Sequence, residues 1–180
     1  MLKQVSDTLL APSNLSHQSL LNIFDVMSHR HIDYADLYFQ LSQDESWVLE
    51  DSIIKEGGFH IDRGVGVRAV SGEKTGFAYS DQINLSSLQQ CAEAVKGIAQ
   101  IKEGNLISPQ AFNAVNAVQR YAAINPLESL SKEKKIELLH LVDRTARAED
   151  PRVTHVSVAL SSIYEEVLVV ATCLLYTSDA

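Results

Sequence analysis

Apolar residues recur at helical spacing in the first 30 residues of the chain. The first set comprises Leu2, Val5, Leu9 and Leu10, and the second comprises Leu20, Ile23, Phe24 and Met27. The second set follows the i, i+3, i+4, i+7 spacing of an amphipathic helix. We therefore predict two helices, the first ended by Pro12 and the second capped by Ser16. Residues 29–31, with the sequence HRH, would close the second helix, where positive charge suits the helix dipole.

Between residues 34 and 80 the pattern changes to alternation of apolar and polar residues, which is typical of strands with one buried face. We predict four strands, Tyr34–Ser42, Glu45–Lys55, Phe59–Val70 and Thr75–Ser80. The turns between them would lie at 43–44, at the glycine pair 57–58, and at 71–74.

Alternate side chains of each predicted strand would lie on opposite faces of the sheet. Trp47, Leu49 and Ile53 would share one face of the second strand. In the third strand Val65, Val67 and Ala69 share a face, and Gly64 and Gly66 lie on the other. A strand glycine leaves room for a second backbone or an aromatic ring, so we expect a close approach there.

Helical spacing returns after residue 84. We predict a helix from Leu85 to Lys102, with Gly104 just beyond its end and a long loop over 105–130. The apolar stripe of this helix would comprise Leu88, Cys91, Ala92, Val95 and either Ile98 or Ala99.

Ser131 would cap a last helix that stops at 150–151, where Asp precedes Pro. The inward residues of that helix would be Ile136, Leu139, Val142 and Ala146. Strands would follow at Arg152–Ser161 and Tyr164–Thr172. The whole pattern predicts an α+β fold, in which an antiparallel β-sheet has helices packed on one face.

Composition limits the function. The chain has 180 residues and a net charge of −8, with no basic run, which argues against binding to a nucleic-acid backbone. It has no apolar stretch of about 20 residues that could cross a membrane. Its N-terminus lacks the features of a signal peptide. Two cysteines, Cys91 and Cys173, do not form a disulfide framework. We expect a cytoplasmic protein.

Glycine motifs do not indicate a nucleotide site. Residues 64–69 match G-x-G-x-x-A, but a dinucleotide fingerprint must join a strand to a helix, and this segment lies within a strand. Residues 72–75, GEKT, lack the Gly-Lys pair and the earlier glycine of a phosphate-binding loop. A structural strand and a polar turn explain them.

Titratable residues do not outline an active site either. None of the six histidines has a second ligand at metal-binding spacing; they are His17, His29, His31, His60, His140 and His155. Two adjacent carboxylate pairs, Glu50 with Asp51 and Glu165 with Glu166, would point to opposite faces of their strands. We therefore assign no catalytic, cofactor-binding or metal-binding residue, and no cofactor, to this chain.

Two segments nevertheless resemble a known family. Residues 33–82 contain DYADLYFQLSQDESWVLEDSIIKEGG and GEKTGFAYSDQ, and residues 150–172 follow more weakly. Together they resemble the N-terminal domain of TldD/PmbA zinc metallopeptidases. The WVLED segment at 47–51 favours the TldD branch.

The resemblance implies an enzyme that hydrolyses unfolded peptides and pairs with a PmbA/TldE-like subunit. It places zinc in a C-terminal domain, on a His-Glu-x-x-x-His motif and a distant Cys that this chain does not contain. The chain alone would then be inactive, and would enclose substrate or contact the partner. A stand-alone protein- or peptide-binding module with no enzymatic role is the alternative.

The last eight residues, CLLYTSDA at 173–180, resemble the translation of a transposon-derived adapter sequence. We expect residues 1–172 to form a TldD-like N-terminal domain that is truncated at its C-terminal end, and 173–180 to be a non-native tail. Such a tail would supply no native partner for the edge of the preceding strand.

Overall fold

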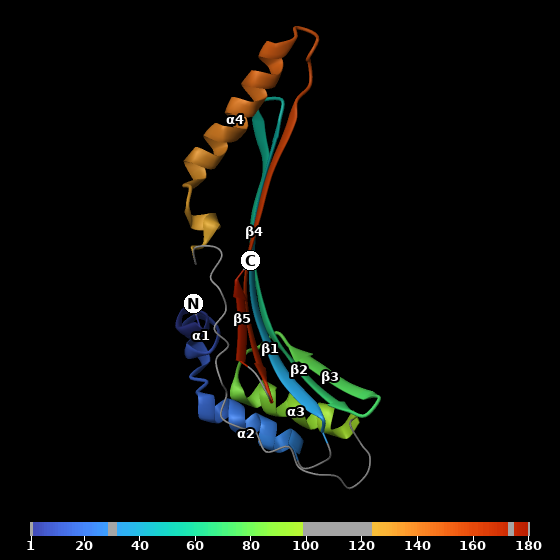
Figure 1. Ribbon diagram of the computed structural model, residues 1–180. Helices are drawn as coiled ribbons and strands as arrows, with labels where there is room; N and C mark the ends of the chain where they lie inside the picture. Colours follow the sequence, from blue (N-terminus) through green and yellow to red (C-terminus); the bar gives the residue numbers. More distant parts are fainter. Residues whose placement is uncertain (1, 29–31, 99–123, 173–174, 180) are drawn as a thin grey trace. The chain divides into compact units, whose positions relative to one another are not determined.

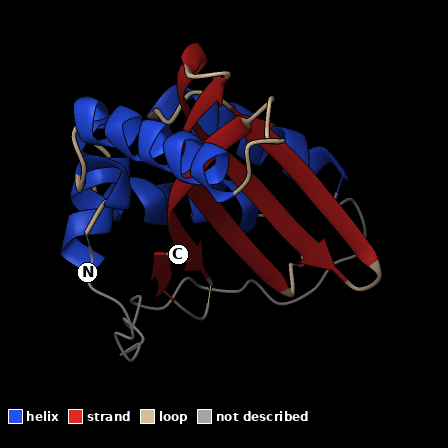
Figure 2. Cartoon of the chain, turned by 90° about the horizontal axis from the view of Figure 1, so that it is seen from above, coloured by secondary structure: helices blue, strands red, loops and turns tan. Residues whose placement is uncertain are grey.

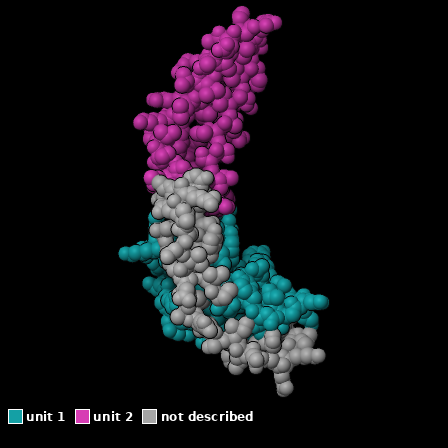
Figure 3. Space-filling model, viewed as in Figure 1, with its two compact units in different colours: residues 1–41, 62–122, 166–180 teal, residues 42–61, 123–165 magenta. Residues whose placement is uncertain are grey.

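The computed structural model describes residues 2–28, 32–98, 124–172 and 175–179. The chain divides into two compact units (Figure 3). Unit 1 comprises residues 1–41, 62–122 and 166–180, and unit 2 comprises 42–61 and 123–165. Three strands contribute residues to both units.

The sheet has five strands in the order β3-β2-β1-β4-β5. They are β1 (Tyr34–Glu50), β2 (Ile53–Ser71), β3 (Lys74–Ser80), β4 (Ser157–Ala171) and β5 (Leu175–Asp179). The pairs β2–β3 and β4–β5 are antiparallel. β1 and β4 also run in opposite directions, because the Thr172 amide donates to the Ala35 carbonyl and the Asp51 amide donates to the Val156 carbonyl.

The described helical segments are α1 (Leu2–Leu9), η1 (Ala11–Ser13), α2 (His17–Ser28), α3 (Leu85–Ile98), η2 (Pro126–Glu128) and α4 (Lys132–Glu149). In unit 1, α2 and α3 lie against one face of the sheet (Figures 1 and 2). In unit 2, α4 packs along the strands. This arrangement confirms the α+β prediction of an antiparallel sheet with helices on one face.

The core of unit 1 contains the apolar stripes predicted from the sequence. Ile23 and Met27 of α2 and Leu88 and Val95 of α3 are almost wholly buried. The strands contribute the other side of this core, with Leu37, Phe39, Val65, Val67 and Ala69. Burial of so many large apolar side chains accounts for most of the stability of the unit.

Gly64 and Gly66 mark the predicted close approaches. A Cβ atom at Gly64 would lie 2.9 Å from the carbonyl oxygen of Ser80, and one at Gly66 would lie 3.0 Å from the Phe77 ring. Glycine is therefore needed against a backbone at one position and against an aromatic ring at the other.

The predicted turns at 43–44 and 57–58 are wrong, because β1 and β2 run unbroken through both. The chain reverses at Asp51 and Ser52 instead, with φ of 46° and 65°. Aspartate visits this left-handed region more readily than most residues, although glycine is the usual choice. The glycine pair has a different role, since Gly57 makes room for the Trp47 ring.

Two other boundaries differ from the predictions. Residues 152–161 and 164–172 do not form two strands, because β4 is continuous from Ser157 to Ala171. β5 pairs with β4 from Val170↔Leu175 to Glu166↔Asp179, so that part of the β4 edge has a strand partner. The predicted helix end at 99–102, Gly104, most of the 105–130 loop, residues 29–31 and Cys173 lie outside the described residues.

Candidate functional site

Unit 2 is organised around a polar contact face on α4. Ser131 caps this helix as predicted, since its hydroxyl accepts a hydrogen bond from the Lys134 amide. The buried stripe, however, consists of Lys135, Leu139 and Asp143. The prediction that Ile136, Leu139, Val142 and Ala146 point inward is right for Leu139, but Val142 is 50% exposed and the other two are half-buried. Pairing of both charges allows this polar stripe to be buried.

Lys135 is held by two acceptors. Its ammonium group donates to the Glu45 carboxylate and, over 2.7 Å, to the Leu127 carbonyl. Glu45 also accepts a hydrogen bond of 2.6 Å from the Trp47 indole. Burial alone would raise the pKa of Glu45, but the hydrogen bonds from Lys135 and Trp47 lower it overall. These contacts fix the start of α4 to β1.

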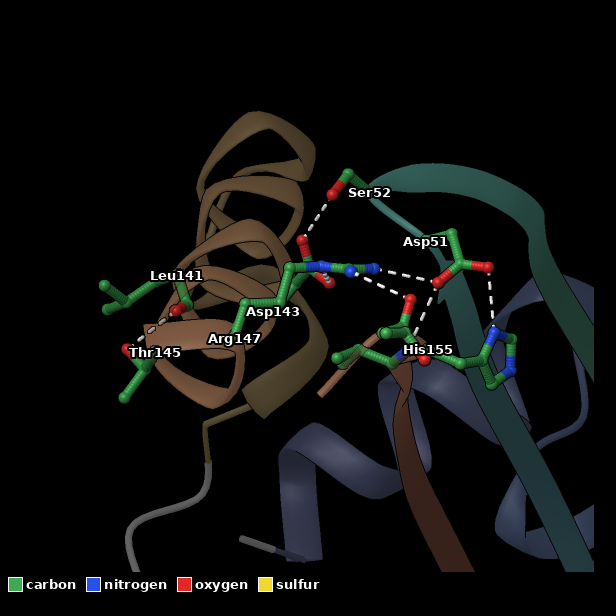
Figure 4. A network of polar contacts seen from close by, with 9 residues as sticks. Asp51, Ser52, Leu141, Asp143, Thr145, Arg147 and His155 are labelled. Atoms are coloured by element: carbon green, nitrogen blue, oxygen red, sulfur yellow. Dashed lines mark hydrogen bonds and ion pairs between the residues drawn. The ribbon is translucent and has the colours of Figure 1, made fainter. Parts of the chain in front are cut away.

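A second network holds the Asp51–Ser52 turn (Figure 4). The Asp51 carboxylate accepts a hydrogen bond of 2.8 Å from Arg147 and one of 3.2 Å from the Val156 amide. Its other oxygen lies 2.8 Å from Nδ1 of His155. Contacts with His155, Arg147 and the Val156 amide lower the pKa of Asp51 from 3.8 to about 2.

Asp143 completes this network from inside α4. It accepts hydrogen bonds from the Ser52 hydroxyl, over 2.5 Å, and from Nε of Arg147, over 3.0 Å. Its side chain is 2% exposed, and the Ser52 contact is the largest of the causes that lower its pKa. Arg147 therefore lies between two carboxylates, and its Nη1 also donates to the Thr154 carbonyl over 3.2 Å. This mutual pairing of Asp51, Asp143 and Arg147 indicates a structural clasp.

The sequence did not reveal this network, because Asp51 and His155 are 104 positions apart. The sequence predicts Glu50 and Asp51 as strand neighbours on opposite faces, whereas Asp51 belongs to the turn. Among the residues that the structure describes, no three His, Cys, Asp or Glu side chains converge where they could hold a metal ion.

An open strand edge runs beside the clasp. β2 pairs with β3 only from Val65 to Ser71, so within the described ranges the stretch from Ile53 to Ile61 has a strand neighbour on one side alone. Ile53, Phe59 and Ile61 are 59%, 59% and 53% exposed and lie on one side of the strand. Within the described residues, this edge has no second strand neighbour, and it carries an apolar row that a partner could cover.

Trp47 extends the apolar row from the neighbouring strand. A Cβ atom at Gly57 would lie 2.5 Å from Cζ3 of Trp47, so the indole covers that glycine. The ammonium of Lys132 lies 5.2 Å from the ring centroid, within cation–π range. Trp47 is half-buried and points toward α4, as expected of an inward strand position. Ile53, which we placed on the same buried face, is exposed beyond the turn.

Two family models match successive segments of the chain. Residues 35–99 match the model of PmbA/TldA metallopeptidase domain 1, and residues 125–173 match that of the PmbA/TldA metallopeptidase central domain. The chain belongs to the PmbA/TldD metallopeptidase family. Within the family it is similar to proteins named metalloprotease TldD homolog, with 85% identity over 172 residues to the one from Haemophilus influenzae. Identity to the one from Buchnera aphidicola of Schizaphis graminum is 43% over 173 residues.

The chain spans only about a third of the length of these relatives. The match to the Haemophilus protein covers 96% of this chain and 36% of that protein. The match to the Buchnera protein covers 95% of this chain and 35% of that protein. The name metalloprotease implies a metal in those proteins. None of the described helices of this chain is long and apolar enough to cross a membrane.

Solved structures share the fold at low identity. A Thermotoga maritima structure described as a DNA gyrase modulator has a TM-score of 0.70 at 16% identity, covering 90% of this chain and 36% of that one. TldE from Thermococcus kodakarensis has a TM-score of 0.65 at 14% identity, with the same coverage.

Proposed function

We propose that this chain is the N-terminal, non-catalytic part of a TldD-like zinc metallopeptidase that hydrolyses unfolded peptides. Membership of the metallopeptidase family and 85% identity to a metalloprotease TldD homolog support this proposal. The zinc and the groups that activate water would belong to the part of the relatives that lies outside this chain. The parent protein would be cytoplasmic and would pair with a PmbA/TldE-like subunit, and the chain alone would have no peptidase activity.

The open edge of β2 carries the more specific part of the proposal. Between Ile53 and Ile61 it would add an extended substrate peptide to the sheet as a further strand. Backbone hydrogen bonds give such binding its affinity, and they do not depend on the side chains of the peptide. This mode suits a peptidase that accepts unfolded chains of different sequence.

The apolar row of Ile53, Phe59 and Ile61 would add a mild preference for peptides with apolar side chains. Ile53, Phe59 and Ile61 are exposed at alternate positions, so they would meet alternate side chains of a bound strand. Burial of each apolar contact contributes on the order of 1–2 kcal/mol, so apolar peptides would bind better than charged ones.

Peptide hydrolysis by the full-length protein with its partner subunit tests this role. We expect F59K/I61K to raise KM about tenfold, equivalent to about 1.4 kcal/mol, with kcat little changed. I163K is the matched control, because Ile163 is an equally exposed isoleucine on β4. An unchanged KM in F59K/I61K would remove the β2 edge from substrate binding.

The reading frame beyond codon 172 separates the peptidase from the alternative of a stand-alone binding module. A continuation that encodes His-Glu-x-x-x-His, together with chelator-sensitive hydrolysis by its product, supports the peptidase. A natural stop codon at that point supports the module, for which the same open edge would be the binding site.

A further inference from the structure

The outer side of α4 carries a shallow groove in addition to the contacts described above. Three leucines line it, Leu130, Leu138 and Leu141, and they are 39%, 45% and 51% exposed. The other lining residues are Lys134, Glu137, His140 and Arg144, and the hollow measures about 500 Å³. All of these residues belong to unit 2.

Leu138 and Leu141 lie outside the buried stripe of α4. The buried residues Lys135, Leu139 and Asp143 repeat every four positions, which places them on one stripe of the helix. At 100° per residue, Leu141 falls about 160° from the centre of that stripe, nearly opposite to it, and Leu138 falls about 100° from it, on the flank. Figure 4 shows Leu141 pointing away from the clasp that Asp143 and Arg147 form. The helix thus buries a mainly polar stripe and presents leucines to the outside, the reverse of the usual arrangement.

The charges at the rim distinguish this groove from the rest of the chain. The protein has a net charge of −8, yet the lining includes Lys134, Arg144 and His140 against a single acid, Glu137. Lys134 and Arg144 are ten residues apart on the helix, which corresponds to about 15 Å along its axis. Leu138 and Leu141 lie between these two cations along the helix.

We propose that this groove binds an acidic amphipathic segment of another polypeptide. Apolar side chains in the middle of that segment would pack on Leu138 and Leu141, and carboxylates about 15 Å apart would meet Lys134 and Arg144. A second copy of this chain is a poorer occupant, because a stable dimer needs about 20–30 residues from each side and the groove has seven. The site is separate from the β2 edge and does not depend on the role proposed for that edge.

Fluorescence anisotropy with the full chain tests the proposal. The probe is a labelled helical peptide with leucines at i, i+3, i+4 and i+7 and glutamates at both ends, and a lysine-ended version is the comparison peptide. We expect saturable binding of the glutamate-ended peptide, weakened about tenfold or more by L138S/L141S. These leucines are exposed, so the variant should keep its fold, and circular dichroism checks this.

Charge reversal identifies the source of specificity. K134E/R144E should exchange the preference, weakening the glutamate-ended peptide and strengthening the lysine-ended one, whereas K3E/K74E, at exposed lysines of α1 and β3, should leave both unchanged. Three results would overturn the proposal: no saturable binding, equal affinity for both peptides, or binding that the leucine and charge variants leave unchanged. Dimerisation of the chain that L138S/L141S abolishes would also overturn it, by assigning the groove to a second copy.

Discussion

At the scale of single residues, the β1–β2 turn shows how a strained conformation is maintained. Asp51 and Ser52 both have positive φ, and each side chain is fixed by a partner from another segment. Asp51 binds Arg147 and His155, while Ser52 donates to Asp143. These contacts offset the backbone cost of the turn. Residue type alone would have favoured glycine there.

The lowered pKa of Asp51 predicts a loss of stability in acid. A carboxylate whose pKa falls from 3.8 in the unfolded chain to about 2 in the fold stabilises the fold above the higher value. This contribution is lost as the pH falls from 3.8 to about 2. D51N should therefore be less stable than the wild type at pH 7 and should lose less stability across that window. Urea unfolding at a series of pH values measures both effects.

D81N is the control for this experiment, because Asp81 is an exposed aspartate in unit 1. Its unfolding curve should follow that of the wild type at every pH. Asparagine also tolerates positive φ, so D51N removes the charge without adding backbone strain. If D51N and the wild type lose the same stability between pH 4 and 2, Asp51 is not the group responsible.

The contact between Gly57 and Trp47 gives a second prediction at this scale. G57A would bring a Cβ atom to 2.5 Å from the indole, so the ring must move away from Glu45 and Lys132. Overpacking of this kind costs about 1–3 kcal/mol. The cost should shrink in a W47A background, since the clash is then absent. Denaturant unfolding of the four proteins gives the coupling, and the single tryptophan reports the ring movement by its emission.

G97A serves as the comparison for G57A, because a Cβ at Gly97 meets nothing within 4 Å. Gly97 lies in α3, where alanine is favoured over glycine by about 1 kcal/mol, so G97A should stabilise. An equal cost of G57A with and without Trp47 would show that the indole does not occupy the space above this glycine.

At the scale of elements, the sequence correctly predicts the helices and strands that bury an apolar face. The stripes of α2 and α3 and the alternation in the first half of β1 and in β2 from Val65 to Ala69 are hydrophobic on one side, and the structure buries that side. The prediction failed for α4, because its buried stripe includes Lys135 and Asp143. The partners of these charges, Glu45 and Ser52, lie about 90 positions away in sequence, and no local pattern reveals them.

The prediction of a turn at residues 57–58 was wrong for the same reason. Gly57 and Gly58 are the strongest turn signal in the region. The structure needs a glycine at position 57 for another reason, because the Trp47 ring of the neighbouring strand lies where a Cβ atom would be. Glycine in a strand can indicate close approach as well as a turn, and one sequence does not separate the two. The candidate sites were missed likewise, since the clasp and the β2 edge both depend on which strands are neighbours.

At the scale of the whole molecule, the chain corresponds to only part of the length of its relatives in the family. The chain matches a first and a central domain, and it covers 36% of a relative named for metalloprotease activity. The clasp, the open edge and the α4 groove are therefore features of one part of such a protein. Under the proposed function, the groups that hold the metal would lie in the remaining length of such a protein.

We predict that this chain alone binds no zinc tightly and that the full-length protein does. The described residues of this chain bring no three ligands together, and a tight zinc site needs three or four. We expect the isolated chain to bind no stoichiometric zinc in equilibrium dialysis at submicromolar free metal, whereas the full-length protein binds one ion per chain. Substitution of the histidines in the expected His-Glu-x-x-x-His motif of the full-length protein should abolish that binding. Substitution of His155, the exposed histidine of the clasp, should leave the zinc content unchanged, because the described residues bring no set of three ligands together around it. One tightly bound zinc in the isolated chain would place a metal site in this part of the protein and would refute its assignment as non-catalytic.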